Sequence, residues 1–435
     1  MRGNRLGRTR LAAVAGAGVL ALTACTAAGA ESAGPVPGAS ATPGAGTNAS
    51  AGANAGTSPG PAASPSSTAS PGPAASRTAS PAASPSVSPT PSASIGASEG
   101  TLRVLTFVGH VEYGGMSHRA NWVGPFEEAT GCRVATLDRV TTSEEMAAKF
   151  AANAYDVVSP SPELAGLLTA RGSVAPVDTS LIEGYGDIPE RLRELPALRR
   201  GDRVYGIPYL WGINQVIGPR GGGDGPADLY AAGPSAIRNS PLSIADAALV
   251  LKRTEPALGI DDPFRLTPAQ LDAAEKLLAA GDGPDRIYWS DPVEVIRAVA
   301  GGSARLAQAW PYHVDLFERA GRPVRAVEAA ETTGWVDSWM LAADTASPNC
   351  AYKWLNWITS QEVQQRASAW TGLAPANPEG CTGHARPICD RHHLGDDKWL
   401  DRVFFAVRPS RDCGGQDGEC TDYDDWANRW KKLVS

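Results

Sequence analysis

The sequence predicts an α/β protein of two lobes with a ligand cleft between them. Three observations lead to this prediction: strand-like and helix-like segments alternate after residue 99, two long extended segments interrupt the alternation, and the length beyond residue 98 suits two hydrophobic cores better than one. Tryptophans, aliphatic residues and charges are interleaved throughout this part of the chain. We expect lobe 1 to comprise about residues 99–207 and 335–435, and lobe 2 about residues 208–334.

Residues 102–171 alternate strands with helices. Gly131 and Gly172 are typical residues at which a helix ends, and Thr142 to Glu145 read as a capping box that begins a helix. The order β-α-β-α-β-α predicts a mainly parallel sheet. We expect strands at LRVLTF (102–107), CRVATLDRV (132–140) and YDVVSPS (155–161), and helices at 121–130, 146–153 and 162–171.

Beyond residue 205, two extended segments frame a more helical region. Thr267 followed by proline, and the run Asp291-Pro-Val-Glu294, are typical of first helical turns. We expect extended chain at 207–218 and 333–341, a strand at 305–310, and helices beginning near residues 242, 267, 291, 347 and 359. The extended segments should join the lobes, and the space between lobes is the usual place for a small ligand.

The first 98 residues are predicted to lie outside the fold. Four arginines and a short apolar run indicate an export signal over residues 1–24. Leu22-Thr23-Ala24-Cys25 resembles a bacterial lipobox, which would make Cys25 a lipidated first residue that anchors the protein to the outer face of the cell membrane; the alternative is a plain signal with an incidental cysteine. Residues 26–98 are almost entirely Ala, Ser, Pro, Gly and Thr, so residues 25–98 should form the anchor and a disordered tether.

The charge of the globular part excludes one class of partner. The whole chain has a formal charge of −7, and leaving out the four signal arginines, with Glu31 and Arg77 cancelling, gives −11 for the domain. An acidic domain argues against nucleic-acid binding. It weakly favours cationic ligands, although solubility alone would also explain it.

The cysteines predict disulfides. Six cysteines follow Cys25, and an even number in an exported protein indicates bridges. Neighbours in sequence pair as Cys381–Cys389 and Cys413–Cys420, which leaves Cys132 with Cys350; three bridges are expected, with the connectivity open.

The same region contains a metal-like spacing. Cys381 and Cys389 alternate with His384 and His392 in a spacing that could hold zinc. Export favours a bridged loop that happens to contain histidines. The sequence contains no phosphate-binding loop and no HExxH motif.

Polar and aromatic residues gather after predicted strands, where ligands bind in open α/β sheets. His110 lies in the glycine-rich turn after the first strand, and Ser161 and Glu163 follow the third. Capping of the next helix is the alternative role for Ser161 and Glu163.

Three tryptophans lie within thirty residues of one another, and two of them flank Asp337. Trp310 ends one candidate strand, and Trp335, Asp337 and Trp339 occupy alternate positions of another, so they would point to one side of an extended chain. Indoles and a carboxylate together suit a cation, whereas indoles alone more often fill a core. We expect Trp335, Asp337 and Trp310 to belong to a binding site and Trp339 to the core.

Several stretches together resemble one family. WVGPFEEATGCRV, YDVVSPS, APVDTSLI, YGIPYLWGINQVI, and GWVDSWM with SPNCAYKWLNWITSQEVQ are similar to solute-binding proteins of ABC importers, in the spermidine/putrescine-binding branch. The resemblance covers nearly all of residues 99–435. It implies a type II periplasmic-binding fold whose lobes close on a ligand and deliver it to permease subunits. It implies no catalysis, no cofactor and no metal, and we expect a monomer.

The resemblance also implies roles for single residues. Trp335 and Trp310 would stack on the methylene chain of a polyamine, Asp337 would pair with an amine, and Ser161 would make a polar contact. Other positions depart from the family: Phe107 stands where the family often has Trp, His110 where it has Tyr, and Glu163 where it has another aromatic residue. Asn239 lies where the branch usually supplies an acid.

Loss of that acid weakens the case for a long polyamine, because each buried ammonium needs a partner. We therefore expect capture of a small cationic, polyamine-like amine. An anchored extracellular zinc enzyme, and a sensor or adhesion module that uses the same cleft, are the alternatives.

Overall fold

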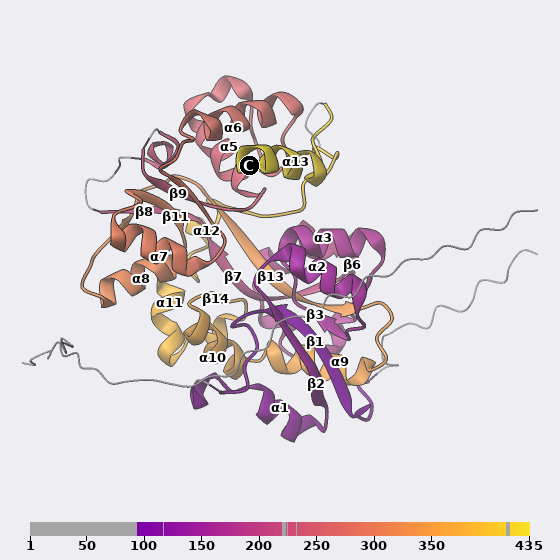
Figure 1. The fold of residues 1–435 in the computed structure, drawn as a ribbon. Helices are drawn as coiled ribbons and strands as arrows, with labels where there is room; N and C mark the ends of the chain where they lie inside the picture. The colour runs from indigo at the N-terminus through magenta and orange to yellow at the C-terminus, as the bar shows by residue number, and fades with distance from the viewer. Residues whose placement is uncertain (1–93, 116, 220–222, 224, 232, 415–417) are drawn as a thin grey trace, which may run out of the picture. The chain divides into compact units, whose positions relative to one another are not determined.

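The computed structural model describes residues 94–435 except residues 116, 220–222, 224, 232 and 415–417 (Figure 1). The predicted export signal, Cys25 and most of the tether lie outside the described residues. Two sheets, each covered by helices on both faces, form the described part. None of its helices has the length and hydrophobicity that crossing a bilayer requires.

The first sheet has eight strands in the order β14-β7-β13-β3-β1-β2, with β4 and β15 also pairing with β13. β1 is parallel to β2 and β3, whereas β13 is antiparallel to β3, β4 and β7. The sheet is therefore mixed, because the returning strand β13 enters its centre. The strands are β1 (Thr101–Phe107), β2 (Arg133–Val140), β3 (Val157–Val158), β4 (Val174–Ala175), β7 (Gly206–Ile213), β13 (Thr332–Ala342), β14 (Ala374–Pro375) and β15 (Val403–Phe405).

The second sheet has five strands in the order β10-β9-β11-β8-β12. β9 is parallel to β10 and β11, and β8 is antiparallel to β11 and β12. The strands are β8 (Gln215–Gly218), β9 (Ser235–Arg238), β10 (Arg286–Trp289), β11 (Leu306–Ala309) and β12 (Arg325–Ala326). A separate pair of strands joins β5 (Arg199–Arg200) to β6 (Arg203–Val204).

The helices begin and end where local signals predict. Thr142 accepts the amide hydrogen of Glu145 at the start of α2, and Thr267 forms a capping box with Gln270 at the start of α6. Gly131 ends α1 with φ of 68°, a left-handed conformation that favours glycine. The helices are α1 (Val123–Thr130), α2 (Ser143–Ala152), α3 (Pro162–Arg171), α4 (Glu190–Arg193), α5 (Ser243–Thr254), α6 (Pro268–Ala280), α7 (Pro292–Gly301), α8 (Pro311–Arg319), α9 (Pro348–Ile358), α10 (Gln361–Thr371), α11 (Arg386–Arg391), α12 (Asp397–Leu400) and α13 (Tyr423–Leu433).

Apolar side chains attach the helices to both faces of each sheet. On the first sheet, Met146 of α2 and Leu164 of α3 pack with Leu105 on one face, while α1 and α9 cover the other. On the second sheet, α7 and α8 cover one face and α5 and α6 the other (Figure 1). Burial of these apolar faces is the main force that holds each lobe together.

Two extended connections join the sheets, as predicted. β7 leads through Asn214 directly into β8, and the chain returns from β12 into β13. Asn214 fixes this crossing because its side chain donates to Thr333 Oγ1 (2.7 Å) and its backbone amide donates to the Thr333 carbonyl (2.9 Å).

A third connection, after β15, was not predicted. We expected the C-terminal residues to belong to lobe 1, but α13 packs against α6 of the second lobe. Trp426 and Trp430 are buried, and Arg429 pairs with Asp272 and Glu275 of α6. The burial of these two indoles stabilises α13 on the second lobe, although the segment before it follows a strand of the first lobe.

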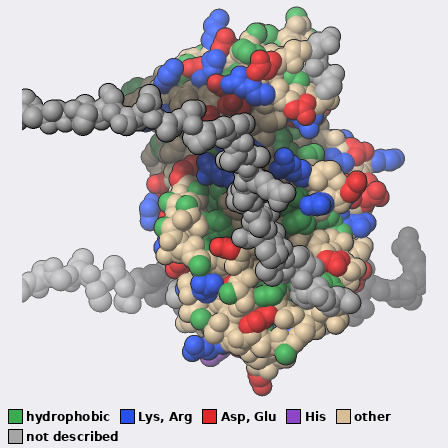
Figure 2. Space-filling model, turned by 90° about the vertical axis from the view of Figure 1, so that its right-hand side faces the viewer, with side chains coloured by type: hydrophobic (Ala, Val, Ile, Leu, Met, Phe, Trp, Pro, Cys, Tyr) green, Lys and Arg blue, Asp and Glu red, His purple; other side chains and the backbone are tan. Residues whose placement is uncertain are grey.

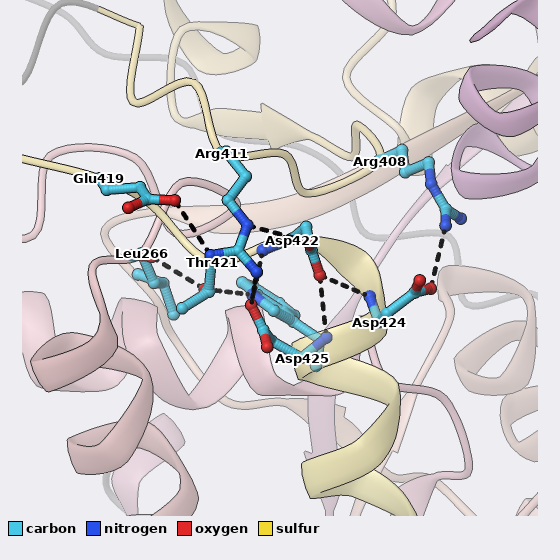
Figure 3. Close-up of polar contacts among 9 residues, drawn as sticks. Leu266, Arg408, Arg411, Glu419, Thr421, Asp422, Asp424 and Asp425 are labelled. Carbon is cyan, nitrogen blue, oxygen red and sulfur yellow. Dashed lines mark hydrogen bonds and ion pairs between the residues drawn. The ribbon is translucent and has the colours of Figure 1, made fainter.

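Ion pairs hold the segment that precedes α13 (Figure 3). Asp422 caps the helix by accepting the amide hydrogens of Asp424 and Asp425, which are the acidic residues favoured in a first turn. Arg411 contacts three acids here: Glu419 (3.0 Å), Asp422 (3.0 Å) and Asp425 (3.3 Å).

All three disulfides form with the predicted pairing. Cys132–Cys350 joins residues 218 apart in sequence, linking the end of α1 to α9, and Cys381–Cys389 and Cys413–Cys420 close short loops. The zinc interpretation is wrong, because the two sulfur atoms that it needs are bonded to each other. The described part of the chain holds no cluster of three or more potential metal ligands.

Candidate functional site

The predicted site residues come from strand ends of both sheets. His110 follows β1, and Ser161 and Glu163 follow β3; in the second sheet Trp310 follows β11. The carboxyl ends of parallel strands meet at one edge of a sheet, which is where open α/β sheets bind ligands. Figure 2 shows a hollow between the upper and lower parts of the molecule, with hydrophobic side chains inside it and basic side chains at its edge.

Trp335 and Trp310 form a pair of indoles contributed by different elements. Trp335 lies in β13 and Trp310 follows β11 of the second sheet, and their ring centroids are 4.9 Å apart. Trp310 is also fixed by a hydrogen bond from its Nε1 to Asn214 Oδ1 (3.2 Å). The two rings that we expected in the site are therefore in contact with each other.

Gly212 makes room for the Trp335 ring. The two residues are cross-strand partners in β7 and β13. A Cβ atom on Gly212 would lie 2.5 Å from Trp335 Cζ2 and Cη2, closer than atoms can approach. The position of the indole thus depends on a residue without a side chain at this point of the facing strand.

Arg238 places a guanidinium on this pair of indoles. Its Cζ lies 5.4 Å from the Trp310 ring centroid and 5.7 Å from that of Trp335, distances typical of cation–π contacts. Arg238 ends β9, which neighbours β11, so strand order brings Arg238 and Trp310 together. We did not predict Arg238; its signal was its place at the end of a strand, directly before Asn239.

Asp337 is a buried carboxyl group without a hydrogen bond in the described structure. Only 5% of the residue is exposed, and its closest charged or polar partner is His110, whose Nε2 lies 3.7 Å from Asp337 Oδ2. Burial raises the pKa of Asp337 to about 8; the charge of Arg238 opposes this rise and that of Glu163 adds to it. The carboxyl group is therefore largely protonated at neutral pH.

His110 is a neutral neighbour of this acid. Burial lowers the pKa of its imidazole to about 4, and its Nδ1 has no hydrogen-bond partner within the described structure. Its ring contacts Phe107 and Tyr209, with centroids 5.7 and 5.9 Å away. His110 thus lies beside Asp337 as a neutral aromatic ring rather than as the cation of an ion pair.

Glu163 forms a second buried acidic group. Its Oε1 accepts hydrogen bonds from Ser161 Oγ and Ser143 Oγ, both at 2.6 Å. Ser161 occupies the N-cap position of α3, but its side chain makes no capping bond and turns to Glu163 instead. The capping role that we considered for Ser161 is therefore wrong. Ser143, at the start of α2, is a partner that we did not predict.

The side chain of Asn239 forms hydrogen bonds with Trp430 and Ser290. Its Oδ1 accepts a hydrogen bond from Trp430 Nε1 (2.8 Å), and its Nδ2 donates to Ser290 Oγ (3.3 Å). Asn239 thus secures α13 on the second lobe. Trp339, by contrast, is fully buried against Tyr209 and Trp354 in the core of the first lobe.

A polar cluster stands behind the indoles. The half-buried carboxylate of Asp246 accepts hydrogen bonds from Thr333 Oγ1 (2.6 Å), Gln308 Nε2 (2.7 Å) and Asn214 Nδ2 (3.4 Å). Burial raises the pKa of Asp246 to about 6, against the opposing effects of these donors and of Arg238. This cluster ties the crossing strands to the second sheet.

A cavity of about 60 Å³ adjoins the same cluster. Its lining includes Asn214, Asp246 and Gln308, the charged residues Arg253 and Glu331, and several apolar residues. It contains none of the indoles and neither Asp337 nor Glu163. Asp246 already accepts hydrogen bonds from three donors, whereas Asp337 and the guanidinium of Arg238 have no hydrogen bond within the described residues.

Comparisons with known proteins agree with this architecture. The family of bacterial extracellular solute-binding proteins matches residues 225–380. The fold is shared with a spermidine/putrescine ABC transporter substrate-binding protein from Streptococcus pneumoniae, with a TM-score of 0.59 and 15% identity over 77% of this chain and 99% of that chain.

Two further structures have the same fold. A lipoprotein of Treponema pallidum has a TM-score of 0.58 and 14% identity over 77% of this chain and 99% of its own. A protein described as a GABA receptor has a TM-score of 0.58 and 19% identity over 77% of this chain and 98% of its own. The fold is that of type II periplasmic-binding proteins, as predicted, and the matched family and these structures are binding proteins rather than enzymes.

Proposed function

We propose that this chain, an extracellular solute-binding protein of an ABC transporter, captures a small amine-bearing solute between its lobes and delivers it to a membrane permease. The observation that carries the proposal is Asp337, a buried carboxyl group without a hydrogen bond in the described structure. It lies on the same side of β13 as Trp335, whose ring contacts that of Trp310. A buried acid without partners is unfavourable unless something else fills the place of the partner.

An ammonium group is the partner that fits. It would draw the proton from Asp337 and form a charge-assisted hydrogen bond in a site from which water is excluded. The two indoles would contribute apolar contact to the carbon chain and cation–π attraction to the charge. The spermidine/putrescine-binding protein and the GABA receptor that share this fold are named for ligands that carry a primary amine, which supports the proposal.

A long polyamine fits this site less well than a solute with one ammonium group. Arg238 already supplies a positive charge at the indoles. Two unit charges of the same sign about 5 Å apart repel by roughly 3 kcal/mol at an effective dielectric constant of about 20. A second ammonium near Arg238 would meet this repulsion.

We further propose that Cys25 is lipidated and that residues 26–98 tether the domain to the membrane. Such a chain would span roughly 50 Å on average, enough to let the domain reach a permease. Mass spectrometry of the mature protein extracted from membranes would detect the acyl groups on Cys25. An unmodified N-terminus that begins elsewhere would contradict the anchor.

The pH dependence of amine binding tests the role of Asp337. In the free protein the carboxyl group is protonated below its pKa of about 8, and an ammonium needs it ionised. The apparent affinity for an amine should therefore rise about tenfold per pH unit between pH 6 and 8 and level off above pH 8. Calorimetric titration with monoamines, diamines and ω-amino acids measures this, and buffers of different ionisation enthalpy reveal the proton that binding releases.

A flat profile over this range would show that the amine pairs with another group. If none of these amines bound, the proposal that the solute carries an amine would be wrong. Binding should also stabilise the protein, by about 2.7 kcal/mol when the ligand is at a hundred times its Kd, so thermal shift provides a second readout.

Gly212→Ala tests whether the position of Trp335 matters for binding. The added methyl group cannot fit against the indole, so the ring must move. We expect a fivefold to tenfold loss of affinity and a loss of stability of about 1–3 kcal/mol. Titration and urea unfolding measure the two effects.

Gly206→Ala is the matched control. It lies in the same strand, and its new Cβ would meet Ser338 Oγ at 2.7 Å and Leu198 Cδ2 at 3.0 Å. It should lower stability by a similar amount and leave the affinity unchanged. Equal affinities in the two variants would show that the indole position is unimportant.

A further inference from the structure

The guanidinium of Arg238 is held in place but left without a polar partner. Its backbone amide donates to Gln308 Oε1 (2.9 Å), and its carbonyl accepts from Ser243 Oγ (2.8 Å). The side chain lies on the Trp310 and Trp335 rings and, within the described residues, makes no hydrogen bond and no ion pair. The face of the planar guanidinium thus contacts the indole rings, while its five N–H donors have no acceptor among the described residues.

The two arginines that precede α13, Arg408 and Arg411, have acidic partners. Arg411 contacts three carboxylates, and Arg408 pairs with Asp424 (3.4 Å) and donates to the Glu163 carbonyl (3.4 Å), as Figure 3 shows for the acids. The domain is acidic, so carboxylates are available as partners. The open edge of Arg238 is therefore a local property of the site.

Arg238 and Asp337 carry opposite charges at one site but form no ion pair. The charge of Arg238 lowers the pKa of Asp337, yet no guanidinium nitrogen lies within 4.0 Å of a carboxyl oxygen of Asp337. Glu163 adds a second acid on the side of Asp337. A basic group without a polar partner and a buried acid without a hydrogen bond thus lie at one pair of indoles, within the described residues.

We propose that the solute carries a carboxylate as well as an amine, and that Arg238 binds the carboxylate while Asp337 faces the amine. This inference rests on the proposed function and narrows its solute class to amino acids, with the two charged groups separated by a short chain along the indoles. The guanidinium edge matches a carboxylate in a bidentate arrangement.

The competing interpretation is that Arg238 occupies the place of a ligand cation and leaves when the ligand arrives. The two interpretations predict opposite results for the loss of the arginine. If Arg238 competes with the ligand, its removal strengthens amine binding; if it binds the carboxylate, its removal abolishes the preference for amino acids.

The test compares solutes that differ only in one end group. ω-Amino acids and α,ω-diamines with the same number of methylenes, from two to five, are titrated calorimetrically into the intact domain. We expect at least one amino acid to bind a hundredfold or more tightly than its matched diamine. In Arg238→Met this ratio should fall to about one or below, and Arg238→Lys should retain only part of it.

Arg411→Met is the control variant, because it removes an arginine that already has acidic partners, and it should keep the preference of the native protein. Circular dichroism and thermal unfolding verify that each variant is folded. The comparison within the native protein does not depend on any variant.

Each outcome separates the two proposals. Tighter binding of diamines than of matched amino acids, or an amino-acid affinity that Arg238→Met leaves unchanged, overturns the assignment of Arg238 and leaves the amine site standing. Failure of both solute series to bind removes the amine site and this inference together.

Discussion

Asp337→Asn should abolish amine binding and at the same time stabilise the protein without ligand. The carboxyl group is the only acid that the site presents without hydrogen-bond partners among the described residues, so an ammonium would lose its counter-charge. Removing one partner of a buried charge-assisted hydrogen bond costs an affinity factor of a hundred or more. Titration with whichever amine the native protein binds measures this loss.

The gain in stability follows from the raised pKa. Below about pH 3.8 the carboxyl group is protonated in both the folded and the unfolded state. Between pH 3.8 and about 8 the unfolded state loses the proton and the folded state keeps it, so the free energy of unfolding falls as pH rises. At about 1.4 kcal/mol per pKa unit, this cost reaches about 6 kcal/mol at most near pH 8, and an uncharged asparagine avoids it.

The stability of Asp337→Asn relative to the native protein should therefore be greatest near pH 8 and shrink toward pH 4. Urea unfolding at several pH values measures this trend. Asp156→Asn is the control: Asp156 is buried too, but its carboxylate accepts from Arg103 N (2.8 Å) and Thr345 Oγ1 (2.8 Å), so this change should destabilise the protein. A loss of stability in Asp337→Asn at pH 8 would show that Asp337 is a structural acid.

Removal of the Cys132–Cys350 bridge should cause the largest loss of stability. The bridge closes a loop of 218 residues, and its removal frees the unfolded chain from this constraint. The loop-entropy relation gives about 5 kcal/mol for such a loop and about 2.5 kcal/mol for one of eight residues. We expect Cys132→Ala with Cys350→Ala to lower the free energy of unfolding by about 3–5 kcal/mol.

Cys381→Ala with Cys389→Ala is the matched control, because its bridge spans only eight residues. It should cost about 2–3 kcal/mol. Urea unfolding without added reductant or oxidant measures the free energy of unfolding of both variants. The dependence of that free energy on urea concentration checks that loss of the bridge lets the unfolded chain expand. A smaller cost for the long-range bridge than for the short one would contradict the loop argument.

Local patterns predicted the secondary structure of the first lobe well. The capping residues Thr142 and Thr267 and the terminating glycines Gly131 and Gly172 act within one or two turns of their own helices. Such interactions depend on neighbours in sequence, so the sequence alone contains them. The same holds for the short disulfide loops.

The C-terminal helix shows why other parts could not be predicted. Its burial depends on α6, which lies far away in sequence, and on a hydrogen bond from Trp430 to Asn239. Only the folded chain shows that α13 crosses to the second lobe. The hydrogen bond of Asn239 to Trp430 could not be predicted for the same reason, because this partner comes from that helix.

Sequence by itself determined many of the elements, the two crossing strands, the bridges and the alternation that puts Trp335 and Asp337 on one side of β13. Only the tertiary structure showed that the charged group on the Trp310 and Trp335 rings is the guanidinium of Arg238. Successive side chains of an extended segment point to opposite sides, so Arg238 reaches the site and Asn239 turns to α13. One position along a strand thereby changes the expected solute from a polyamine to an amino acid.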